Sequence, residues 1–116
     1  MRRRPSEREV QFEVADGRLV RTVTFPDGGG YVHRCTQAIY EAVAHAVEET
    51  SDSGATLDGL AEKLDAPFTQ VAVALDFLKE RGCVVTRLRR NYPASGFLFE
   101  DAMVEYHALA EGESAS

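Results

Sequence analysis

The chain has 116 residues, of which 44% are hydrophobic and 28% charged, and its formal net charge is −6 at pH 7. This length and composition predict one globular domain with a hydrophobic core of its own. No apolar run approaches the roughly 20 residues that a helix needs to cross a bilayer. No apolar segment follows the basic start either, so we expect a cytoplasmic protein without a membrane partner. The acidic total argues against a nucleic-acid partner, because phosphate binding favours a basic surface.

The sequence contains no pattern of a catalytic or metal site. Its three histidines, His33, His45 and His107, lie in separate segments, and neither a GxSxG nor a CxxC motif is present. His33 and Cys35 would supply two ligands where zinc needs three or four. Cys83 follows a helix-ending glycine and reads as a small buried hydrophobe. We therefore expect no enzyme, no cofactor and no metal.

The N-terminal part predicts a β-hairpin. Residues 1–7 carry three consecutive arginines, and we expect a disordered arm that either lies along DNA phosphates or is simply solvated. Glu9 to Phe25 alternates apolar and polar residues about Asp16-Gly17, a pair typical of a type I′ turn. Pairing about that turn gathers five apolar side chains on one face: Val10, Phe12, Val14, Leu19 and Val23. That face must pack on the helices or on a second subunit.

Four helices and two further strands are predicted after residue 30. A short strand is expected at 31–34. Thr36 and Thr56 are expected N-caps, each preceding apolar residues at helical spacing. The expected helices are 36–50, 56–64, 67–81 and 100–111, with Pro67 in the first helical position of the third. The expected strands of a second hairpin are 83–86 and 97–99, and residues 112–116 are expected to be disordered.

The stretch from Thr56 to Leu98 reads TLDGLAEKLDAPFTQVAVALDFLKERGCVVTRLRRNYPASGFL. This order of short helix, tight turn, longer helix and Arg-rich hairpin resembles the winged helix-turn-helix of small bacterial transcription regulators, such as the MarR and ArsR families. The resemblance implies an α+β fold in a single domain, 8–111. It implies a winged-helix core of three helices plus a two-stranded wing at 36–99, with an N-terminal hairpin extension at 8–35 and a C-terminal helix at 100–111. It also implies a homodimer that binds double-stranded DNA and regulates transcription.

In such families the second helix of the motif enters the major groove with its N-terminal residues toward the bases. By that alignment, the outward positions here are Phe68, Thr69, Gln70, Ala72, Val73 and Asp76. Gln70 can pair with adenine, Thr69 can reach a base edge or a phosphate, and Phe68 and Val73 can contact thymine methyl groups. No Lys or Arg stands between Lys63 and Lys79, which departs from the family's usual pattern.

The expected wing is basic, because residues 83–99 carry three arginines and no acidic residue. The residues that the resemblance assigns to DNA phosphates or the minor groove are Arg87, Arg89, Arg90, Asn91 and Tyr92. Three arginines per subunit of a dimer would give a log–log salt dependence of roughly −5. The alternative is a solvated hairpin tip whose arginines offset an acidic body.

The sequence also allows a second function, protein–protein interaction. Exposed Phe68 and Val73 would form an apolar patch on a helix with little positive charge, and such patches mark protein interaction sites. The chain would then be a winged-helix module for protein–protein interaction and assembly without DNA binding. The hairpin face and the last helix are candidates for homodimer contacts.

Overall fold

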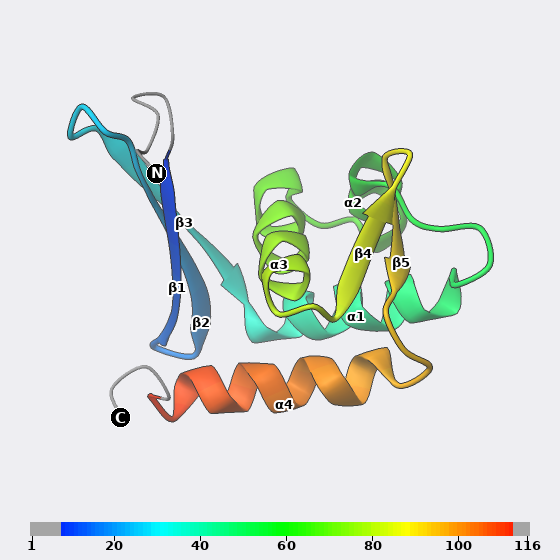
Figure 1. The fold of residues 1–116 in the computed structure, drawn as a ribbon. Helices are drawn as coiled ribbons and strands as arrows, with labels where there is room; N and C mark the ends of the chain where they lie inside the picture. Colours follow the sequence, from blue (N-terminus) through cyan, green and yellow to red (C-terminus); the bar gives the residue numbers. More distant parts are fainter. Residues whose placement is uncertain (1–7, 113–116) are drawn as a thin grey trace, which may run out of the picture.

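The computed structural model describes residues 8–112, and within that range it has a mixed α+β fold with two antiparallel sheets and four helices (Figure 1). The strands are β1 (Glu9–Ala15), β2 (Arg18–Thr24), β3 (Gly30–Thr36), β4 (Val84–Arg87) and β5 (Arg90–Pro93). The helices are α1 (Gln37–Glu49), α2 (Leu57–Leu64), α3 (Phe68–Glu80) and α4 (Leu98–Ala110). The α+β class is confirmed, whereas the expected arm at 1–7 and the expected tail beyond residue 112 lie outside the described residues. No helix within 8–112 is both long and apolar enough to cross a membrane.

Strands β1, β2 and β3 form one antiparallel sheet in that order. The predicted hairpin register is confirmed, with Phe12 opposite Arg21. Asp16 and Gly17 both have positive φ, 54° and 72°, as a type I′ turn requires. The strand expected at 31–34 is longer, spans Gly30–Thr36 and pairs along the whole of β2. The N-terminal unit is therefore a three-stranded sheet, which can carry a stable packed face where two strands alone are marginal.

The helix starts follow their capping residues closely. The side chains of Thr36 and Thr56 cap α1 and α2 by accepting the backbone N–H three residues on, at 3.2 and 3.0 Å. Asp65 ends α2 with φ of 51° in the left-handed region. Pro67, expected in the first helical position, is instead the N-cap of α3 with an extended ψ of 134°. The shift costs little, because the N–H that proline lacks has no intrahelical partner at either position.

The second hairpin differs from the expectation. Its first strand is β4, as predicted, but β5 lies inside the stretch that was expected to be an Arg-rich loop. The residues expected as the second strand, 97–99, instead begin α4, whose first residue Leu98 is fully buried. A short apolar run such as Phe-Leu-Phe fits a strand or the start of a buried helix equally well. Leu88 and Arg89, with φ of 50° and 68°, make the two-residue turn between β4 and β5.

The core joins the sheet to all four helices. Tyr40 of α1 and Phe77 of α3 are fully buried, with ring centroids 5.9 Å apart. The Tyr40 hydroxyl donates to the carbonyl of Ala102 in α4 at 2.7 Å, and burial raises the pKa of this phenol well above its usual range. The Tyr106 hydroxyl donates to the carbonyl of Gly17 at 3.1 Å, which attaches α4 to the turn of the first hairpin. The Cys83 thiol is buried, as predicted.

Candidate functional site

Helix α3 is one of the elements that the DNA hypothesis depends on, and its exposed residues lie at its two ends. Phe68 retains 52% of its surface and Thr69 is also exposed. Val73, predicted to face outward, is fully buried, and Gln70 and Ala72 are half-buried. The prediction of an outward position is therefore wrong for Val73, whereas Phe68 and Thr69 do face solvent.

The three-stranded sheet covers this face. Figure 1 shows the sheet on one side of α3 and the β4–β5 hairpin with α2 on the other. The Gln70 side chain, expected to read a base, accepts the backbone N–H of Thr36 at 3.0 Å. Further along the helix, the rings of Phe77 and Phe12 meet edge to face with centroids 5.3 Å apart. The sheet therefore contacts α3 near both of its ends, while Ala72 and Asp76 between these contacts stay partly exposed.

A cluster of three side chains, the buried Arg21 and the partly exposed Asp76 and His33, joins the sheet to α3. Arg21 of β2 is only 7% exposed, and its guanidinium forms an ion pair with Asp76, another residue expected to face outward. The second terminal nitrogen of Arg21 lies 3.0 Å from Nδ1 of His33. Because a guanidinium only donates, a hydrogen bond between these two atoms requires the His33 nitrogen as its acceptor. Asp76, whose side chain is 36% exposed, is thus matched by a positive charge within the fold.

Sequence reasoning assigned no role to Arg21, although a signal was present. Arg21 occupies the same face of β2 as Leu19 and Val23, both buried, so a charged residue stands at a core-facing position. A buried charge requires a partner. The search for that partner would have led to an acidic residue on the element that packs against the sheet.

The β4–β5 hairpin does expose positive charge. Arg87 and Arg89 are exposed, and the guanidinium of Arg87 lies 4.4 Å above the half-buried ring of Tyr92. Between the two arginines, Leu88 is 95% exposed at the tip of the turn. The hairpin therefore ends in an arginine on each side of one solvated apolar side chain.

The other two expected wing residues serve the fold. Asn91 is buried, and its side chain donates to the carbonyl of Ala55 at 2.9 Å and accepts from the Thr86 hydroxyl at 2.9 Å. Arg90 is exposed but its Nη1 lies 3.4 Å from the carbonyl of Gly54. Asn91 was expected to contact DNA, and its burial removes it from the surface. It instead ties β5 to the segment before α2, where it also forms a backbone bridge with Ala55.

The thiols offer no nucleophile. Burial raises the pKa of Cys35 from 9.0 to about 12 and also raises that of Cys83. Both side chains are therefore protonated near neutral pH and unreactive in the folded state. Among residues 8–112, no group of three or more His, Cys, Asp or Glu side chains is placed to hold a metal ion.

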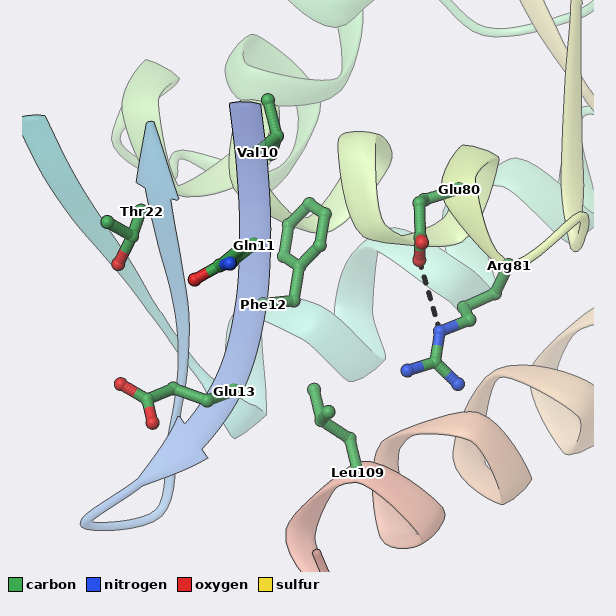
Figure 2. A pocket seen from close by; sticks show the side chains of 8 residues that line it. All are labelled: Val10, Gln11, Phe12, Glu13, Thr22, Glu80, Arg81 and Leu109. Atoms are coloured by element: carbon green, nitrogen blue, oxygen red, sulfur yellow. Dashed lines mark hydrogen bonds and ion pairs between the residues drawn. The ribbon is translucent and has the colours of Figure 1, made fainter. Parts of the chain in front are cut away.

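Two further surfaces stand out from the rest of the described chain. At the start of α4 the N-cap residue Phe97 is 66% exposed, and Val104 within the helix is 64% exposed. A cavity of about 500 Å³ runs beside β1, between that strand and the C-terminal ends of α3 and α4 (Figure 2). Its far wall includes Glu80, Arg81 and Leu109.

Comparison with known proteins gives no match to a protein-family model, to a curated protein or to a solved structure.

Proposed function

We propose that this chain is a protein-interaction module with a winged helix-turn-helix order of elements and no DNA-reading helix. The winged-helix part is supported by the succession α1, α2, α3, β4 and β5, with a short turn between α2 and α3. It is further supported by the bridge from Ala55 to Asn91, which ties the hairpin to the segment that precedes α2. The absence of a catalytic role remains part of this proposal.

The proposal rests mainly on the packing of the three-stranded sheet against α3. A helix that reads DNA must present side chains to base edges in the major groove. In this chain Gln70 is bonded to the sheet, Asp76 is paired with Arg21 and Val73 is fully buried. Freeing these side chains would break a part-buried ion pair and expose Val73 and Phe77 to water, which costs several kcal/mol in total.

Exposed apolar side chains support the interaction role. Phe68, Leu88, Phe97 and Val104 each keep more than half of their surface in solvent. Of the two residues in the apolar patch expected on α3, Phe68 is exposed to a partner and Val73 is buried. Apolar groups that stay exposed on a folded domain are where a protein partner gains the most from binding.

Duplex DNA binding stays a second candidate because of one observation, the exposure of Arg87 and Arg89 at the hairpin tip. Two arginines on a hairpin can neutralise phosphates without reading sequence. This candidate predicts weak, strongly salt-dependent binding with no preference among base sequences.

A DNA titration separates the two candidates. Fluorescence anisotropy would be followed with a random-sequence duplex and with a set of defined duplexes, at about 50 and 200 mM salt. We expect no sequence preference, and at 200 mM salt no binding tighter than the about 100 µM typical of non-specific contacts. Low-salt binding that Arg87→Ala/Arg89→Ala removes, and that the charge-matched control Arg18→Ala/Arg34→Ala retains, would favour the second candidate.

The proposal is overturned by a tight, sequence-selective complex. In particular, selectivity that Thr69→Ala or Gln70→Ala abolishes, with the fold intact by circular dichroism, would mean that α3 does read the groove.

A further inference from the structure

The outer edge of β1 is a free edge of the three-stranded sheet. β1 pairs with β2 on one side, and no strand within residues 8–112 pairs with its other side. Its sequence EVQFEVA contains no proline, glycine or lysine, and its register with β2 runs without a bulge. Proteins usually blunt exposed edges with such features, because an open edge is a template for another strand.

The turn of the hairpin determines which backbone groups point outward. In a two-residue hairpin the residues flanking the turn, here Ala15 and Arg18, form a hydrogen-bonded pair. Bonding then alternates along the strand, so the N–H and C=O groups of Val10, Phe12 and Val14 point away from β2. The backbone N–H and C=O groups of these three residues can therefore form hydrogen bonds with another strand at the free edge.

Space beside this edge is also present. The cavity of about 500 Å³ lies along β1, and its other wall is formed by Glu80 and Arg81 of the α3 end and by Leu109 of α4 (Figure 2). Arg81 donates from Nη1 to the Glu105 carboxylate at 2.8 Å, and its guanidinium carbon lies 5.0 Å from the centroid of the Phe77 ring. An added strand would lie about 4.8 Å from β1 and would cover Val10, which is 39% exposed.

We propose that the strand that pairs here is β1 of a second copy of this chain, which joins the two sheets into one of six strands. The inference rests on the proposed function as a protein-interaction module and names the partner and the edge. The two strands would run antiparallel about a two-fold axis at Phe12, with Phe12 opposite Phe12 of the second copy. This is the register that pairs all seven residues of β1.

Charge selects the same register. With Phe12 on the axis, Arg8 faces Asp16 of the second copy, Gln11 faces Glu13, and Val10 faces Val14. A register centred on Gln11 would place Glu9 opposite Glu13, and one centred on Glu13 would place two copies of Glu13 face to face. Like charges directly opposite each other destabilise a strand pair. A self-complementary edge of this kind forms an isologous dimer.

The test uses the full chain in sedimentation velocity over a range of protein concentrations, with matched variants at Gln11. We expect a monomer–dimer equilibrium. Gln11→Glu creates two like-charge pairs with Glu13 and should raise the dimer Kd about tenfold, while Gln11→Lys creates two opposite-charge pairs and should lower it several-fold. The same charge changes at Val32, exposed on β3 and two strands away, should leave the Kd unchanged.

A backbone variant tests the hydrogen bonding itself. Val10→Pro removes an outward N–H while proline remains tolerated on an edge strand, so it should abolish dimerisation and leave the circular dichroism spectrum unchanged. A monomer at every concentration overturns the inference, as does a dimer whose Kd ignores both Gln11 variants. Neither of these two dimerisation results contradicts the proposed function. The proposed function would fail through a different result, sequence-selective DNA binding.

Discussion

At the scale of single residues, the ion pair between Arg21 and Asp76 links two elements that are far apart in the sequence. Arg21 is buried on β2 and Asp76 lies on α3, so the pair connects the sheet to the helix that sheet covers. A buried charge left without its partner is strongly unfavourable, whereas replacing both partners by apolar groups is often neutral.

We therefore predict that Asp76→Ala lowers the free energy of unfolding by about 2 kcal/mol, a value reduced from the fully buried case because the Asp76 side chain is 36% exposed. Changing both residues, as Arg21→Leu/Asp76→Leu, should recover most of that loss. Urea unfolding of the two variants and the wild type measures both values. Lys63→Ala is the control, since its exposed contact with Glu49 should contribute less than about 0.5 kcal/mol. Equal losses in the single and double variants would argue against a coupled pair.

Residue-level prediction from the sequence worked where the cause was local. Thr36 and Thr56 were predicted as caps and do cap, because the hydrogen bond spans three residues. The burial of Val73 could not be predicted in that way, because it depends on a sheet more than 30 residues away in the chain. One sign was present in α3 itself. Val71, Val73, Ala74, Leu75 and Phe77 make most of its surface apolar, and a helix with a wide apolar surface is buried on most sides.

At the scale of elements, the β4–β5 hairpin was only half predicted. β4 follows the helix-ending Gly82 and is apolar at its start, so local signals identify it. β5 reads Arg-Asn-Tyr-Pro, which resembles a loop by composition. Its strand form depends on the bridge between Asn91 and Ala55, a contact between distant parts of the sequence. The missing signal is therefore tertiary.

The turn of this hairpin allows a stabilising change. Leu88 and Arg89 both have positive φ, which costs a residue with a side chain about 1 kcal/mol or more. Leu88→Asn/Arg89→Gly supplies the pair that a type I′ turn favours, so we predict a gain of about 1 kcal/mol and a rise in Tm of about 4 °C. Thermal unfolding measures the shift. Leu88→Ala, which keeps the strained φ, is the control and should raise Tm by much less. A double variant no more stable than Leu88→Ala would contradict the turn geometry.

At the scale of the whole molecule, one arrangement accounts for several features together. The three-stranded sheet packs against α3, so Val73 is buried and the charged side chains of Arg21 and Asp76 pair with each other. Positive charge remains on the hairpin, and the open edge of β1 remains for another strand. The α+β class could be predicted from the sequence, but the position of the sheet could not, because the hairpin face alone does not specify which helix it covers.

The most direct test of this account asks whether the sheet lies on α3 in solution. Nuclear Overhauser effects would be recorded between the Phe12 and Phe77 rings, whose centroids are 5.3 Å apart, together with the response of the Val73 methyl groups to a soluble paramagnetic agent. We predict strong ring–ring effects and protected Val73 methyls, as a fully buried side chain requires. Missing ring–ring effects together with rapidly relaxing Val73 methyls would contradict the account, because α3 would then be open to DNA.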